Sequence, residues 1–109
     1  MTVHDAVYAV VLHRYIEETY AMRGERLTAK AEEKIRAIAG ALGIRPQRNT
    51  GQLGFAADFT WSVDAIRMAK NRVRATDSMR LVNKLYQAIE GLSVKEIESY
   101  SESRPGEVE

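Results

Sequence analysis

The densest group of side chains suited to binding chemistry lies in the second half of the chain. Residues 62–92 hold six of the sixteen basic residues. In a helix, positions three or four apart share a face. This spacing groups Arg67, Lys70 and Arg74 into one stripe, and Arg72, Arg80 and Lys84 are candidates to extend it. Rows of guanidinium and ammonium groups bind phosphates, so the stripe is a candidate anion or nucleic-acid surface.

The same stripe also fits a solvated helix face whose charges pair with the nearby acids Asp64, Asp77 and Glu90. The chain has 16 basic and 15 acidic residues, which gives a formal net charge of only +1. A balanced charge provides no general argument for a nucleic acid or an anionic membrane as partner. No aromatic residues interleave with the basic ones, as they do where single-stranded bases stack. We therefore favour the solvated face and keep the nucleic-acid surface as the alternative.

Other residues able to support catalysis or metal binding stand at unsuitable spacings. His4 and His13 are nine positions apart, so they do not share a helix face, and no carboxylate beside them completes a metal site. The adjacent pairs Glu17–Glu18 and Glu32–Glu33 point to different sides of a helix, which is typical of solvated charges. The chain has no cysteine and no P-loop, dinucleotide-binding or serine-nucleophile motif. The sequence predicts no enzyme activity, no metal and no cofactor.

Residues 35–54 match only the first half of a helix-turn-helix motif. Residues 35–44 fit its first helix and turn, because apolar residues recur with helical spacing and a glycine follows. The recognition helix must come next, but residues 49–54 are polar and contain two glycines. Since the mismatch affects the half that contacts bases, we do not expect the motif at this place.

The whole chain has the composition of one small globular domain. It has 109 residues, of which 45% are hydrophobic and 28% charged. Helical periodicity predicts a compact all-α bundle of four to five helices over residues 1–100. We expect an irregular loop at 45–61 and a flexible acidic tail at 101–109. No apolar run reaches transmembrane length and the first residues are unlike a secretory signal, so we expect a cytoplasmic protein with no membrane partner.

The first predicted helix runs from a cap formed by Thr2 and Asp5 to about Met22. Beside its main apolar stripe it carries a second one, made of Val3, Val7 and Val10. A helix that is apolar on two sides is either deeply buried or in contact with a partner. Burial within the domain is the commoner case, and the three valines are otherwise a candidate partner surface.

The second predicted helix starts after Thr28, its expected N-cap, and ends at Gly43. Glycine suits the left-handed position after a helix, Ile44 supplies the apolar contact that follows it, and Pro46 prevents continuation. The loop that follows contains three aromatic residues that we expect to dock into the core: Phe55, Phe59 and Trp61.

Residues 62–92 are expected to form two helices rather than one. Drawn on a single helix, the apolar sides of the two halves differ by about half a turn. We therefore predict a break at Thr76–Asp77, with Thr76 as the N-cap of the second helix. An unbroken helix between two partners is the alternative, because no glycine or proline forces the break. A capping box at Ser93–Glu96 predicts a short last helix.

Three segments of the chain, in order, match features of one protein family. Tyr20 to Thr28, with the sequence YAMRGERLT, is followed by Ala31 and Ile35. An arginine-rich pattern comes second, with Ile66-Arg67, Ala69, Arg72, Arg74 and Arg80-Leu81. The third segment is Leu92-Ser93 followed by Glu96-Ile97. Together they resemble the C-terminal helical lid of AAA+ ATPases of the Rubisco-activase (CbbX) and stage V sporulation protein K type.

The resemblance implies a helical lid that meets a nucleotide only when it is joined to an ATPase core. In that family an Asn-Ala-Arg step enters the lid helix, and its arginine senses the nucleotide. Here Ser62-Val63-Asp64 stands in that place, and an acidic residue repels a γ-phosphate. Arg67 is the only nearby arginine able to substitute.

From these observations we expect a non-enzymatic helical interaction module, either a detached AAA+ lid or a stand-alone adaptor of that shape. Its expected partner is a protein or a second copy of the chain. The alternative is a small phage- or plasmid-type regulatory protein that binds nucleic acid through the basic helix face.

Overall fold

The computed structural model describes residues 1–23, 29–55 and 61–100. These residues form five helices: α1 (Val3–Arg23), α2 (Ala29–Ala41), α3 (Val63–Ala75), α4 (Met79–Ile89) and α5 (Val94–Glu98). Within the described ranges there is no strand, and a single antiparallel bridge joins Phe55 to Trp61. The predicted all-α bundle of four to five helices is confirmed. The tail at 101–109 and the predicted Thr28 cap and Phe59 anchor lie outside the described residues.

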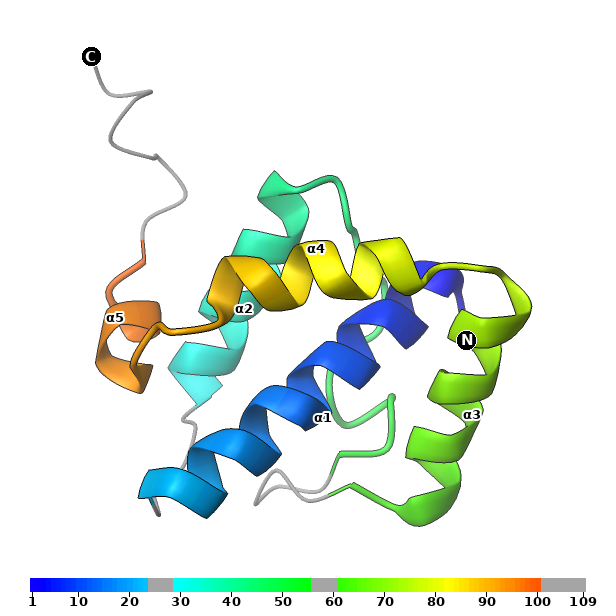
Figure 1. Cartoon of the computed structure of the whole chain (residues 1–109), viewed down its shortest axis with the longest axis horizontal. Helices are drawn as coiled ribbons and strands as arrows, with labels where there is room; N and C mark the ends of the chain where they lie inside the picture. Colours follow the sequence, from blue (N-terminus) through cyan, green and yellow to red (C-terminus); the bar gives the residue numbers. More distant parts are fainter. Residues whose placement is uncertain (24–28, 56–60, 101–109) are drawn as a thin grey trace.

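The helix α1 is the centre of the bundle (Figure 1). It packs against α3 and against α4, which crosses it, while α2 packs against α4 and α5. Residues from both predicted stripes of α1 are buried, including Val7, Tyr8, Val11 and Leu12. A helix covered by neighbours on several sides needs apolar residues around most of its circumference. The two stripes of α1 are explained in this way without a partner.

Three of the predicted helix ends are confirmed. At the start of α1, the Asp5 amide donates to Thr2 Oγ1 at 3.0 Å. At the end of α2, Gly43 has a φ of +83°, and the Ile44 amide donates to the Ala39 carbonyl at 2.9 Å. Ile44 is fully buried, as expected for the apolar contact of this motif. At α5, a capping box joins Ser93 and Glu96.

The helix break in residues 62–92 is confirmed, but the predicted cap is wrong. Helix α3 ends at Ala75 and α4 begins at Met79. Thr76 is the C-cap of α3 rather than the N-cap of α4, because its hydroxyl donates backward to the Arg72 carbonyl at 2.6 Å. Asp77 has a φ of 52°, a left-handed conformation that aspartate tolerates better than most residues. This residue turns the chain between the two helices.

The loop before α3 is held against the bundle by its two anchors. Phe55 is buried and Trp61 is half-buried, and their ring centroids lie 3.7 Å apart. Gly54, which precedes Phe55, packs closely against α3. It has a φ of +104°, and a Cβ added there would lie 2.4 Å from Ala65 Cβ. Only glycine fits this position without a shift of the backbone.

Candidate binding surface

The predicted anion-binding residues all lie on α3 and α4 and are all exposed: Arg67, Lys70, Arg74, Arg80 and Lys84. We call this set the basic face. Helix α3 directs its charges outward because Ala69 and Val73 are buried on its other side. Helix α4 buries four residues, Val82, Leu85, Tyr86 and Ile89, so its opposite side faces the solvent as predicted.

Acidic neighbours neutralise little of the charge on this face. Arg67 Nη1 lies 3.5 Å from Asp64 Oδ1, and both side chains are exposed. Within the described part of the chain, the other four basic-face residues form no ion pair. The predicted pairing with Asp77 and Glu90 is therefore not formed. The formal charge of residues 63–89 is +4, from six basic and two acidic residues, which leaves −3 for the remainder of a +1 chain.

A hollow of about 380 Å³ lies where α1, α3 and α4 meet. Its lining is mostly apolar and combines Val10, Val73 and Met79 with Lys70, Arg74 and Asp77. The hollow places two basic-face residues of α3 beside the first residue of α4. The two helices thus contribute to one continuous surface at their junction.

Two large apolar residues of α3 are exposed, and one of them differs from the prediction. Met68 falls on the apolar side of the sequence pattern, next to buried Ala69, but is 60% exposed, and Val63 is 69% exposed. Helix α3 packs mainly against α1, so only a narrow strip of its circumference is covered. The exposed methionine and valine are available for apolar contact with a partner.

The candidate valine surface on α1 is mostly covered by the chain itself. Val7 is fully buried, and Val3 and Val10 are partly buried and pack against the core. Val7 is therefore not accessible to a partner in this structure. Val10 remains relevant because it lines the hollow between α1, α3 and α4.

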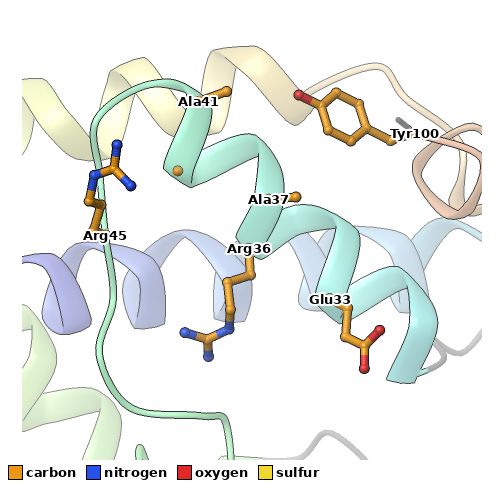
Figure 2. A pocket seen from close by; sticks show the side chains of 7 residues that line it. Glu33, Arg36, Ala37, Ala41, Arg45 and Tyr100 are labelled. Atoms are coloured by element: carbon orange, nitrogen blue, oxygen red, sulfur yellow. The ribbon is translucent and has the colours of Figure 1, made fainter. Parts of the chain in front are cut away.

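A second hollow, of about 370 Å³, lies along α2 (Figure 2). Figure 2 shows side chains from α2, from the loop after it and from the segment after α5 around this hollow, among them Glu33, Arg45 and Tyr100. Arg36 also lines this hollow, but its guanidinium pairs with Glu32 and donates to the Arg48 carbonyl. Among the described residues no ion pair joins Glu33 to Arg45 across this hollow.

Glu32 was expected to be a solvated charge, and this prediction is wrong. It is buried, and its carboxylate and carbonyl both accept from the Tyr8 hydroxyl. Burial and the charge of Glu32 raise the pKa of Tyr8 well above its ordinary value of 10.0. The Arg36 guanidinium lies 3.6 Å from Glu32, stacks over the Tyr8 ring, and donates to the Arg48 carbonyl at 2.7 Å. These contacts fasten α1, α2 and the following loop together.

A second cluster of the same composition joins α1 to α4. Tyr86 donates to Glu18, and Arg14 lies 3.9 Å above the Tyr86 ring and 3.4 Å from Glu18. Burial, followed by the hydrogen bond to Glu18, raises the pKa of Tyr86 to about 12. Both tyrosines therefore stay protonated near neutral pH, and each hydroxyl donates across a contact between two helices.

Asp5 is a fully buried carboxylate that was recognised only as a capping residue. Its Oδ1 accepts from the amides of Gln47 at 2.7 Å and Arg48 at 3.0 Å. Burial alone would raise the pKa of Asp5, but the hydrogen bonds from Arg48, Thr2 and Gln47 together hold it below 3.8. Asp5 thus remains charged and fixes the loop after α2 to the start of α1.

The structure places the two histidines in separate contacts. His4 Nδ1 accepts from the Arg45 amide at 3.0 Å, and His13 lies 3.5 Å from Glu17. Nowhere in residues 1–23, 29–55 and 61–100 do three His, Cys, Asp or Glu residues gather as a metal ligand set. The half-motif at 35–44 is followed by a loop at 45–54 and not by a second helix, in agreement with the sequence interpretation.

The comparisons with protein-family models, with curated proteins and with solved structures find no match to this chain. The resemblance to the AAA+ lid therefore stays a prediction. Of its key residues, Ser62 is the N-cap of α3, and Arg67 is exposed and paired with Asp64. None of the helices in the described ranges has the length and apolar character needed to cross a membrane.

Sequence reasoning missed two features of this surface. The hollow at the junction depends on Val10, which lies far from α3 in the sequence, so no local pattern indicates it. Asn83 and Gln87 are exposed on the side of α4 opposite its apolar residues and are not among the predicted contact residues. Their spacing with Arg80 and Lys84 was the available signal.

Proposed function

We propose that this chain is a non-enzymatic helical interaction module that binds an anionic partner through the basic face. The observation that carries the proposal is the separation of charge. Residues 63–89 have a formal charge of +4 in a chain whose remainder is −3, and four of the five basic-face residues form no ion pair within the described part.

Two pairs of like charges on the basic face repel each other within their own helices. Lys70 and Arg74 are four positions apart on α3, as are Arg80 and Lys84 on α4. Like charges at this spacing destabilise a helix by about 0.2–0.5 kcal/mol for each pair. A bound anionic partner attracts these same cations and thereby offsets the repulsion between them.

The module fits a stand-alone adaptor or a detached AAA+ lid that binds an acidic protein. Exposed Met68 and Val63 favour that partner, because protein interfaces combine charged rims with apolar contact. A small nucleic-acid-binding regulatory protein is the second candidate, and the unpaired cations favour it directly. Both candidates use the same surface, so one experiment tests whether that surface binds anions.

Chromatography on immobilised heparin, a sulfated polyanion, tests the proposal. The wild-type chain should be retained at physiological salt, and Arg67→Gln/Lys70→Gln/Arg74→Gln should elute at clearly lower salt. Each lost contact reduces the counterions released on binding, so the salt dependence should weaken as well.

The matched control is Lys30→Gln/Arg45→Gln/Lys95→Gln, whose three residues are also exposed but lie on α2, the loop after it and α5. Each triple variant changes the formal charge from +1 to −2, so a difference between them reports position and not net charge. Equal elution of the two variants, or no retention of the wild type, would contradict the proposal. Unchanged circular dichroism spectra should accompany both.

A further inference from the structure

The connection between α3 and α4 has the length of the turn in a helix-turn-helix. Three residues separate Ala75 from Met79, and the middle one, Asp77, has a φ of 52°. Ser78 is buried, and its amide donates to the Val73 carbonyl at 3.0 Å, which fixes the turn. Two helices joined by a three- or four-residue turn form the unit that many DNA-binding proteins place on the duplex.

The direction of the two helices is also fixed by a third. Figure 1 shows α3 and α4 running in clearly different directions, with α1 packed against both. A helix that supports both members of the pair holds their relative orientation rigid, as a DNA-reading unit requires. Val10 of α1 lies in the hollow at this junction, together with Lys70 and Met79.

The outer side of α4 carries hydrogen-bonding side chains that match base edges. Four exposed residues recur with three- and four-residue spacing along the helix: Arg80, Asn83, Lys84 and Gln87. Arginine and lysine pair with guanine in the major groove, and asparagine and glutamine pair with adenine. The major groove is wide enough to admit an α-helix.

On α4, unlike on α3 with its exposed Met68 and Val63, the composition favours DNA over an acidic protein as the anionic partner. The centre of a protein interface is depleted of lysine and enriched in aromatic residues, methionine and arginine. The stripe on α4 has two cations and two amides and no aromatic residue. On α3, Lys70 and Arg74 stand beside the start of α4, where the phosphates flanking the groove would lie.

We infer that α3 and α4 form a helix-turn-helix that binds duplex DNA, an inference that rests on the proposed function of the basic face. Helix α4 enters the major groove, with Asn83 and Gln87 reading bases. The cations of α3, Lys70 and Arg74 among them, contact phosphates and position the helix.

Selection of binding sites from a duplex library with a randomised centre tests this inference. The wild-type chain should enrich a sequence motif. In fluorescence-anisotropy titrations, four or five phosphate contacts give a slope of log affinity against log salt of about −4. Asn83→Ala/Gln87→Ala should lower affinity for the selected duplex by about 30-fold or more while leaving affinity for random duplex unchanged.

The double variant Lys70→Gln/Arg74→Gln distinguishes phosphate contacts, which position the helix, from base contacts, which give sequence specificity. It should weaken binding to selected and random duplexes alike and make the salt slope shallower by about 2, since each phosphate contact contributes about 1. Circular dichroism and thermal unfolding of both double variants establish that the bundle is intact.

Three results would overturn the inference. They are the absence of an enriched motif, equal binding to duplex and to polyglutamate, and an Asn83→Ala/Gln87→Ala variant that binds the selected duplex like the wild type. Binding of polyglutamate would identify an acidic protein as the partner class. If heparin retention still depends on the basic face, the proposed function stands and only the assignment of DNA fails. If heparin is not bound either, both fail.

Discussion

Replacing Asp5 by asparagine tests how the loop after α2 is held to the bundle. The carboxylate is fully buried, and its Oδ1 accepts the amides of Gln47 and Arg48. Its Oδ2 accepts the Thr2 amide at 3.4 Å. An asparagine of the same shape keeps one oxygen for the loop amides but places an amide group against the Thr2 donor.

The expected cost follows from these three contacts. Hydrogen bonds to a charged group contribute about 1.5–3 kcal/mol and neutral ones about 1 kcal/mol. Two bonds are weakened and one is lost, so Asp5→Asn should reduce the free energy of unfolding by about 2–3 kcal/mol at neutral pH. The effect is large for a domain of this size, whose total stability is about 5–15 kcal/mol.

The pH dependence of this effect has a definite sign. The pKa of Asp5 in the folded chain is lowered below 3.8, so the unfolded chain binds the proton more tightly. The stabilisation is therefore complete above the unfolded pKa of about 3.9 and is lost as the pH falls through the folded pKa. The difference between wild type and Asp5→Asn should shrink over the same range.

Urea unfolding followed by circular dichroism, at neutral pH and at steps down to strongly acidic pH, measures this difference. Asp64→Asn is the matched control, because Asp64 is exposed and its pairing with Arg67 lies on the surface. That change should cost about 1 kcal/mol or less, because Asp64 also lies in the first turn of α3. If Asp5→Asn were no more destabilising than Asp64→Asn, the loop anchor would be wrongly assigned.

Other predictions concern three turns and are measured by thermal unfolding. Gly54→Ala should destabilise by about 2–4 kcal/mol, because its Cβ meets Ala65 at 2.4 Å and its φ is +104°. Gly43→Ala should cost only about 1 kcal/mol, since its φ is +83° but the space is open; equal losses at the two glycines would refute the contact with Ala65. Asp77→Gly should stabilise by about 0.5 kcal/mol by relieving the left-handed conformation, and a loss of stability would argue against that strain.

The sequence predicts those parts of the fold that depend on neighbouring residues. The end of α2 follows from Gly43 and Ile44, and the break after Ala75 follows from the phase of the apolar residues. The cap at Thr76 is wrong because a threonine hydroxyl has two options. It can accept from an amide later in the chain, as an N-cap does, or donate to a carbonyl earlier in the chain, as Thr76 does to Arg72. Local sequence does not distinguish these two choices.

Contacts between distant segments were not predictable in the same way. The spacing of Glu32 and Arg36, four positions apart, indicates an ion pair along one helix. The burial of Glu32, however, depends on Tyr8, which lies on another helix. The amphipathic pattern of α4 placed Arg80 and Lys84 outward correctly. The pattern of α3 did not place Met68 correctly, because how much of a helix is covered depends on the number of its neighbours.

The most direct test of the binding surface is an amide NMR titration of the chain with short heparin fragments at physiological salt. If the basic face binds anions, saturable shifts of the amide signals should concentrate in α3, in α4 and in the turn between them. Signals from α2 and from the loop at 45–54, including the hollow around Glu33 and Arg45, should remain unchanged. Shifts centred on that hollow, or no saturable shifts at all, would contradict the assignment of the basic face.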